Sequence, residues 1–477
     1  MSVTFLVAAV GYLALLLAVG LRLAKKNEGL ESFFLASRRL GAPRVAFSLC
    51  ASWIGATSLL VSTDQACREG INAFWIIGLP AVVTLLLFLP LAKVIRRLKG
   101  MTISDIIESR YGSAARLVTT FLLVWYMMVL AASQMVAAGT FLKTFLGTSY
   151  LASLGAATAI VLLYSGVGGF LSVVRTQSLH FFLLMAGIVA MVASLRLRSS
   201  FSAVRDTARG LGKTHYFDFF AHADRNLLIA LSFVLAWTIS PIAWQRIQAA
   251  RGDRSARLGL GSAALFLGIF YSGIVLAGML FLPLFPDPSL PGPVISDFIL
   301  GRAGTALGSL VFVTVLAAIM STMVAAVNAG AFSLTRDLLR YRGMSEETRS
   351  VGWGRFSTLI VGAGAFLVAT RFQDILKTLG LASKIMAEGL FIPGLAALLM
   401  KKKAPRAGLL GLSAGGGYAL LCFMSEAGLV TLPIPPWPRS LLPGLALNAA
   451  GFGIGWLWDR LKAKKGQSPR GAVPPQA

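Results

Sequence analysis

Two adjacent hydroxyl residues, Ser321 and Thr322, interrupt an apolar run that reads Ala317-Ala-Ile-Met-Ser-Thr-Met-Val324. Hydroxyl and carbonyl oxygens are hard ligands for a dehydrated alkali cation, and they cost less inside a membrane than a buried carboxylate does. The alternative is that each hydroxyl bonds back to a carbonyl one turn earlier, as is common on apolar helices. The pair is a candidate cation site with an ordinary structural alternative.

Small and hydroxyl residues gather in a second apolar run, Ser48-Leu-Cys-Ala-Ser-Trp-Ile-Gly-Ala-Thr-Ser58. Gly55 lowers helix stability locally, and Ser and Thr side chains can satisfy backbone groups that unwinding sets free. We therefore expect a helix break near the bilayer centre. The alternative is close packing of a small-residue helix face.

A third run, Trp237-Thr-Ile-Ser-Pro241, predicts another break, because Pro241 removes a backbone donor and pushes Ser240 away from α geometry. A simple kink is the alternative. Transporters place their sites at such broken helices, where unwound backbone offers carbonyl and N–H groups. The predicted solute pocket between the breaks consists of Ser52, Trp53, Gly55, Ser58, Phe233, Trp237 and Ser240, with Trp75 nearby.

The indole rings and hydroxyls of this pocket suit a small, partly apolar solute, or one whose cationic group stacks on an aromatic ring. For Trp75 the alternative is an anchor at the membrane surface. Lys384 and Glu388, spaced i and i+4, are expected to face the same cavity, where Lys384 would meet a carboxylate; a structural ion pair is the alternative. His180 is a candidate proton carrier, although a neutral, hydrogen-bonded histidine is the simpler interpretation.

These residues lie in a chain of 477 residues that is 56% hydrophobic and only 13% charged, too apolar for a water-soluble surface. Apolar runs long enough to cross the roughly 30 Å hydrocarbon core recur throughout, so the whole chain is predicted to be a membrane domain. We predict thirteen spans, near residues 3–23, 44–63, 71–95, 117–146, 150–168, 171–195, 226–245, 257–284, 305–334, 354–371, 376–400, 407–430 and 438–459.

The basic residues predict how these spans are oriented. If the N-terminus is outside, 31 of the 44 Lys and Arg residues fall in the cytoplasmic loops and tail, and 12 fall outside, six of them between Arg196 and Arg225. This distribution favours a multi-pass inner-membrane protein with its C-terminus in the cytoplasm. It also argues against nucleic-acid binding, despite the formal charge of +25, because the cations are spread over short loops.

Other chemistry is disfavoured by composition. The three cysteines and three histidines show no metal-ligand spacing, so neither a metal enzyme nor a disulfide framework is expected. The first apolar run, residues 3–23, lacks a basic segment before it and is followed by Arg22, Lys25 and Lys26, which favours a retained helix over a cleaved signal. The predicted breaks lie in the second and seventh spans, five apart, as two inverted five-helix repeats would place them.

At this point the sequence resembles the sodium:solute symporter family over about residues 30–405. The resemblance rests on six motifs in order: Phe33-Phe-Leu-Ala-Ser-Arg-Arg-Leu40, Thr102-Ile-Ser-Asp-Ile-Ile-Glu-Ser-Arg-Tyr-Gly112, Tyr164-Ser-Gly-Val-Gly-Gly-Phe-Leu-Ser-Val-Val174, Gln245-Arg-Ile-Gln-Ala-Ala250, Met320-Ser-Thr322 with Leu334-Thr-Arg-Asp-Leu338, and Pro393-Gly-Leu-Ala-Ala-Leu-Leu-Met-Lys-Lys402. It implies an all-α, LeuT-like fold with a 5+5 inverted repeat, one extra N-terminal helix and two C-terminal helices.

The corresponding divisions are residues 1–43 for the extra helix and first cytoplasmic loop, 44–198 for the first repeat, 199–225 for an extracellular loop, 226–400 for the second repeat, 401–462 for the C-terminal helices and 463–477 for a short polar tail. The resemblance also implies a sodium site formed by the carbonyls of Ala51, Ile54 and Ala318 and the hydroxyls of Ser321 and Thr322.

Two departures from the family pattern refine this expectation. Many members carry Asp after the Thr where this chain has Thr176-Gln177, and that Asp is associated with a second sodium, so a single coupling ion is expected. The positions that hold polar sugar ligands in one branch are Trp53, Ser58 and Ile77 here, which disfavours a sugar.

The leading hypothesis is therefore sodium-coupled uptake of a small organic solute by alternating access, with Na⁺ as the coupling ion, no other cofactor, the lipid bilayer as surroundings and no obligate protein partner. Proton coupling through His180 or Glu388 and a transporter-like solute sensor are the alternatives, and an enzyme is disfavoured. Amino acids, monocarboxylates and other organic acids, vitamins and quaternary amines all remain open as solutes.

Overall fold

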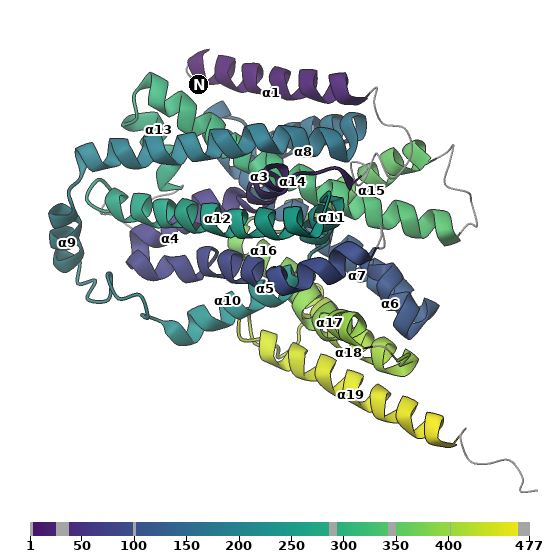
Figure 1. Cartoon of the computed structure of the whole chain (residues 1–477). Helices are drawn as coiled ribbons and strands as arrows, with labels where there is room; N and C mark the ends of the chain where they lie inside the picture. Colours follow the sequence, from purple (N-terminus) through teal and green to yellow (C-terminus); the bar gives the residue numbers. More distant parts are fainter. Residues whose placement is uncertain are drawn as a thin grey trace, which may run out of the picture.

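A computed structural model describes residues 3–24, 38–98, 102–285, 293–341, 350–400 and 402–465. These residues form helices and connecting turns without a β-strand, apart from one isolated backbone bridge between Leu40 and Ala250. The helices pack as an elongated bundle with α1 and α19 at opposite borders (Figure 1). The first residues of α1 lie at the end of the bundle that carries α9, and α19 finishes at the other end, where α6 lies (Figure 1).

The helices follow the apolar runs of the sequence, with shorter helices at both ends of the bundle. In chain order they are α1 (Val3–Ala24), α3 (Ala42–Trp53), η2 (Thr57–Val61), α4 (Ser62–Glu69), η3 (Gly70–Trp75), α5 (Gly78–Arg97), α6 (Ile103–Tyr111), α7 (Ser113–Leu146), α8 (Tyr150–Arg198), α9 (Phe201–Gly210), α10 (Ala223–Thr238), α11 (Pro241–Ala249), α12 (Asp253–Phe281), α13 (Val294–Gly301), α14 (Thr305–Tyr341), α15 (Ser350–Arg371), α16 (Ile375–Lys384), η4 (Ile385–Leu390), α17 (Phe391–Leu399), α18 (Pro405–Glu426) and α19 (Leu441–Lys465). Of the short segments, η2 and η4 are π-helical and η3 is a 3₁₀-helix.

Nine helices in the described part of the chain are long and apolar enough to cross a membrane, or ten if the bent pair α10 and α11 is one span. The sequence predicted separate spans at 150–168 and 171–195, whereas α8 is continuous from Tyr150 to Arg198, with apolar parts at Tyr150–Leu163 and Thr176–Arg198. Glycines weaken a helix without forbidding it, and no proline lies between residues 150 and 198.

α14 lies at the centre of the bundle, and α7 and α8 pack against it. In its most apolar stretch, 89% of the residues are buried inside the protein. Small residues let these backbones approach closely. A methyl group added at Gly330 of α14 would lie 2.8 Å from the Cβ of Met127 on α7. Packing of this kind takes the place of the hydrophobic effect inside a membrane, and it gives the broken helices a rigid surface to lie against.

Both predicted helix breaks are present. The second predicted span is interrupted between α3 and η2, and in the seventh the chain bends by 44° between α10 and α11. The segments before and after the breaks are tied together at one end of the bundle, where Leu40 N–H donates to Ala249 O at 3.0 Å and Arg251 N–H donates to Leu40 O at 2.8 Å. Two of the sequence motifs, ending at Leu40 and Ala250, therefore meet; residues 33–37 of the first lie outside the described residues.

Candidate functional site

The break after α3 opens the helix at the position that the sequence predicted. Trp53 is the last helical residue, and Ile54, with φ −83° and ψ 83°, leaves α geometry before the π-helical turn η2 begins at Thr57. The freed backbone is held by side chains of neighbouring helices, since the hydroxyl of Tyr271 donates to Trp53 O at 3.1 Å. In a membrane such substitutes are needed, because an unpaired peptide group costs several kcal/mol.

Gln134 of α7 is a functional candidate that sequence reasoning missed. Its Oε1 accepts the backbone N–H of Ala56 at 2.8 Å, immediately after the break, and its side chain is buried. Its Nε2 donates to the Ser133 hydroxyl at 3.1 Å. A buried glutamine inside the long apolar run of residues 117–146 was the available signal, because a polar group at that depth needs a partner.

The five predicted sodium ligands, Ala51, Ile54, Ala318, Ser321 and Thr322, are all buried, and they come from the break and from α14, two elements that pack together. The two hydroxyls differ. Ser321 Oγ donates to Ala318 O at 3.1 Å, the back-bonding that the sequence left open. Thr322 Oγ1 is buried with no hydrogen-bond partner in the described part of the chain.

The orphan hydroxyl of Thr322 faces the break. A Cβ built on Gly55 would lie 3.1 Å from Thr322 Oγ1 and 2.7 Å from Gln134 Oε1. A side chain at residue 55 would therefore push the ends of the Gln134 and Thr322 side chains away from the unwound backbone. A buried hydroxyl without a partner is costly unless something else satisfies it, and a cation held by the adjacent oxygens would do so.

A small cavity of about 40 Å³ lies between the two breaks. Its lining contains six of the predicted pocket residues, Ser52, Trp53, Gly55, Ser58, Trp237 and Ser240. Ligand pockets for small molecules usually measure about 300–1,000 Å³. The volume here is close to the share of one water molecule, about 30 Å³, so a solute enters only if the surrounding helices move apart.

Aromatic rings cover this cavity. The indoles of Trp53 and Trp237 lie 5.4 Å apart between ring centroids, which joins α3 to α10 across the two breaks. Phe233 also stacks on Trp237, with ring centroids 5.1 Å apart and planes at 19°. Phe233 is therefore a neighbour of the cavity wall and not part of the lining.

The structure does not bring Trp75 to the cavity. Its Nε1 donates to Phe219 O at 2.9 Å, and its ring contacts Phe219 and Phe220 in the segment that follows α9. The indole is satisfied there by this hydrogen bond and by aromatic packing.

Lys384 and Glu388 also lie away from the cavity, which corrects the expectation that they face it. Lys384 Nζ donates to the Ser440 hydroxyl at 2.6 Å and lies 3.8 Å from the Glu388 carboxylate. The carboxyl group of Glu388 lies directly against Gly444 of α19, since a Cβ built on this glycine would be 2.4 Å from the carboxyl carbon. The i, i+4 pattern placed both on one helix face correctly, but that face packs against α18 and α19.

His180 of α8 accepts or donates a hydrogen bond at 2.9 Å to the hydroxyl of Tyr12 on α1. Both side chains are buried at this helix contact. His180 is thus hydrogen-bonded between two helices, as in the simpler interpretation of the sequence, and it does not line the central cavity.

A polar network lies beside the break, where the family pattern has its Asp. Gln177 Oε1 accepts from Ser48 Oγ at 2.5 Å and from Arg246 Nη2 at 3.2 Å, and Gln177 Nε2 donates to Ser52 Oγ at 2.8 Å. Arg246 is fully buried and also donates to Ile242 O at 2.9 Å. The network links α3, α8 and α11 with a positive charge at its centre.

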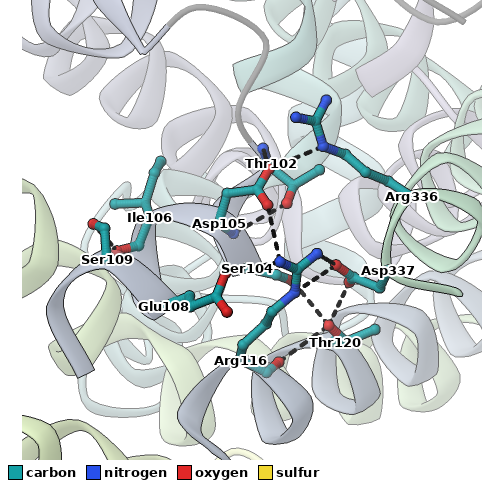
Figure 2. A network of polar contacts seen from close by, with 10 residues as sticks. All are labelled: Thr102, Ser104, Asp105, Ile106, Glu108, Ser109, Arg116, Thr120, Arg336 and Asp337. Atoms are coloured by element: carbon teal, nitrogen blue, oxygen red, sulfur yellow. Dashed lines mark hydrogen bonds and ion pairs between the residues drawn. The ribbon is translucent and has the colours of Figure 1, made fainter. Parts of the chain in front are cut away.

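A second polar cluster explains two further motifs. Arg116 of α7 donates to Asp337 near the end of α14, at 2.9 Å from Nε, and to Glu108 of α6 at 2.8 Å (Figure 2). Arg336 Nε lies 3.0 Å from Asp105, which also caps α6 with Thr102 in a capping box. The motifs beginning at Thr102 and Leu334 therefore contribute to one ion cluster, and its ion pairs link α6 to α7 and α14.

Comparisons with known proteins agree with this architecture. Residues 33–415 match the sequence model of the Sodium:solute symporter family. The chain is 25% identical over 388 residues to a sodium/proline symporter of Haemophilus influenzae, covering 75% of this chain and 76% of the relative. It is 24% identical over 480 residues to the sodium/pantothenate symporter of Escherichia coli, covering 95% and 96%.

Among solved structures, a Na⁺-coupled sialic acid symporter in a substrate-bound outward-open state superposes with a TM-score of 0.79 at 16% identity, covering 96% of this chain and 97% of that one. At that identity the likeness shows the fold alone. The family match, in contrast, covers most of the chain. The chain is thus a multi-pass membrane protein of the sodium:solute symporter family, a transporter coupled to sodium and not an enzyme.

Proposed function

We propose that this protein takes up a small organic solute together with one Na⁺ by alternating access. The ion would be held by the carbonyls of Ala51, Ile54 and Ala318 and the hydroxyls of Ser321 and Thr322. The observation that carries this proposal is the buried Thr322 hydroxyl, which has no hydrogen-bond partner in the described residues and lies against Gly55 at the break. An ion at that position would give this oxygen the partner that it lacks.

The proposal of a single ion rests on the network around Gln177. An amide replaces the carboxylate of many relatives, and the guanidinium of Arg246 lies 3.2 Å from its oxygen. A second cation beside that charge would be repelled in a low-dielectric setting and would lack an anionic ligand. We therefore expect a Na⁺ to solute ratio of one.

The solute is expected to be small and partly apolar. No charged residue lines the cavity in the described part of the chain, and its walls combine the two indoles with hydroxyls such as Ser58 and Ser240. Two relatives are named for proline and pantothenate, both compact molecules with a carboxylate. Amino acids and carboxylate vitamins are the first compounds to test, and quaternary amines the next, since they would stack on the indoles.

The topology belongs to the same proposal: thirteen spans, with two inverted repeats of five at residues 44–198 and 226–400, an extracellular loop at 199–225, an outer N-terminus and a cytoplasmic C-terminus. The opposite ends at which α1 begins and α19 finishes support an odd number of crossings (Figure 1). The count of thirteen treats the two apolar parts of α8, Tyr150–Leu163 and Thr176–Arg198, as separate crossings, which requires the chain to reverse its direction between them.

The test is uptake of radiolabelled candidate solutes into proteoliposomes under a sodium gradient or a proton gradient, each imposed alone. We expect accumulation with the sodium gradient only, and a Hill coefficient of one for Na⁺. Accumulation driven by protons alone would instead favour the alternative, in which His180 or Glu388 carries the proton. Sodium-dependent binding without any transport would point to a sensor.

A further inference from the structure

One exposed face of α9 carries cations beside an aromatic ring. Phe201, Arg205 and Arg209 are spaced i, i+4 and i+8 and are exposed, whereas Val204 and Ala208, on the neighbouring stripe of the helix, are buried. α9 therefore lies on the bundle through its small apolar side. Its free side has the composition of a helix at a membrane interface, with arginines above an aromatic ring.

An apolar cavity of about 540 Å³ lies beside this face. Its walls include Phe74 of η3, Phe201, Phe217 and the α12 residues Val275, Leu276 and Met279. Along α12 the exposed side chains of Leu265 and Ile269 continue from its mouth, which marks the side of α12 that faces lipid. The volume and lining suit part of an acyl chain, which would run on along α12.

A second, basic cavity of about 580 Å³ adjoins the first. Arg205, Arg209 and Lys213 line it, and it shares Arg205 and Phe217 with the apolar cavity. Neither cavity is lined by an acidic residue in the described part of the chain. Arg205 and Arg209 form no ion pair with described residues, and Lys213 Nζ donates to Arg68 O at 2.7 Å.

The distribution of charge gives an independent reason to expect an anion here. Six of the twelve basic residues on the outer side fall between Arg196 and Arg225, although positive charge is disfavoured in outer loops. The segment is also fixed in place, since Tyr216 donates to Ala66 O at 2.9 Å and Ile71 N–H donates to Tyr216 O at 3.0 Å. The cations are thus held at the membrane surface against the general bias.

We propose that the two cavities together bind one anionic phospholipid of the outer leaflet. Its phosphate lies between Arg205, Arg209 and Lys213, and one of its acyl chains fills the apolar cavity and follows α12. Charge complementarity selects an anionic head group, and the joined apolar cavity selects a lipid over a soluble anion. The assignment to the outer leaflet follows the topology proposed above, whereas the binding itself does not depend on sodium-coupled transport.

The test is a lipid titration of the purified full-length protein in detergent, read by native mass spectrometry. Phosphatidylglycerol and phosphatidylcholine with identical acyl chains are compared. The variants are Arg205→Gln with Arg209→Gln, and a matched control, Arg254→Gln with Arg257→Gln, in which two exposed arginines at the start of α12 are changed. Folding of each variant is checked by its thermal unfolding profile.

We expect the wild type to bind phosphatidylglycerol on the order of a hundredfold more tightly than phosphatidylcholine, since each of the three basic contacts contributes about a fivefold preference. The double Gln variant should keep only the roughly fivefold preference that Lys213 contributes, while the control keeps the wild-type preference within about twofold. Arg205→Lys with Arg209→Lys should keep most of it, because the charge remains.

A further variant, Ser272→Trp, fills the mouth of the apolar cavity from the lipid-facing side of α12 and should weaken binding of both lipids. Equal affinity of the wild type for the two lipids would overturn the proposal. So would an equal loss of preference in the control, or competition by free glycerol phosphate as effective as that by phosphatidylglycerol, because these results point to unspecific charge or to a soluble anion.

Discussion

Gln134 Oε1 accepts the backbone N–H of Ala56 at 2.8 Å, so a side chain of α7 replaces the hydrogen bond that the broken helix gives up. The acceptor lies 2.7 Å from the position that a Cβ on Gly55 would take, and Thr322 Oγ1 lies 3.1 Å from that position. The break, α7 and α14 thus meet at one point. This arrangement lets the chain stay unwound within the membrane.

Gln134→Leu should impair sodium binding. The change leaves the Ala56 N–H without an acceptor, at a cost of about 1–3 kcal/mol, and lets the backbone at the break move. We expect the half-saturating Na⁺ concentration to rise by about tenfold in proteoliposome uptake. Gln134→Glu keeps an acceptor and should be affected less, and Gln373→Leu, on an exposed residue, is the matched control. An unchanged Na⁺ dependence in Gln134→Leu would contradict this role.

Gly55→Ala should abolish most transport, because the added methyl group would overlap Gln134 Oε1 and crowd Thr322 Oγ1. Backbone movement to relieve that contact would displace the proposed ion ligands. Gly261→Ala is the control, since a Cβ there meets nothing within 4 Å. We expect uptake near the wild-type rate for the control and a loss of at least about tenfold for Gly55→Ala, roughly 1.4 kcal/mol or more. Equal rates for the two variants would show that the close approach is unimportant.

The ion cluster of Figure 2 should matter for stability more than for solute affinity. It joins α6, α7 and α14 away from the cavity, and Asp337→Asn would leave Arg116 short of one partner in a mostly buried site. We expect a loss of about 1–3 kcal/mol, seen as a lower thermal unfolding midpoint, with an unchanged KM for the solute.

Asp253→Asn is the comparison for that experiment. Its ion pair with Arg96 is also at the bundle end, but about a third of each side chain is exposed, so screening reduces its contribution to about 0–1 kcal/mol. Equal destabilisation by the two Asn variants would show that burial does not set the strength of the cluster.

The pair formed by Lys384 and Glu388 should behave as a structural unit. Glu388→Gln leaves the ammonium of Lys384 without its carboxylate among buried side chains, and we expect a loss of about 3–5 kcal/mol of stability. Changing both residues to Met and Gln should restore part of that loss, because the uncompensated charge is gone. If the double variant still takes up solute under a sodium gradient, the pair is not needed for ion coupling. If a well-folded double variant loses coupling, that result would favour a proton-carrying role for Glu388.

The sequence predicted the positions of both breaks because glycine and proline act locally, whatever surrounds them. Six of the residues predicted for the solute pocket line the cavity between the breaks, because they flank the breaks in the sequence. It could not predict that Gln134 caps the first break, because the two are far apart in the chain and only the packing of α7 brings them together.

From the i, i+4 spacing of Lys384 and Glu388 we could predict that both side chains lie on the same face of the helix. The spacing does not indicate which neighbouring helix this face packs against. The same holds for Trp75, whose hydrogen-bond partner, Phe219, lies far away in the chain. α8 is continuous, whereas the sequence predicted two spans over the same residues.

The most direct measurement is the Na⁺ dependence of solute uptake by Thr322→Ala in proteoliposomes, with Thr358→Ala, a buried threonine of α15 bonded to Gly354 O, as the control. If Thr322 Oγ1 is an ion ligand, its removal should raise the half-saturating Na⁺ concentration by about tenfold or more, roughly 1.4 kcal/mol, while the control stays near the wild-type value. A Thr322→Ala variant that retains the wild-type Na⁺ dependence would contradict the proposed site.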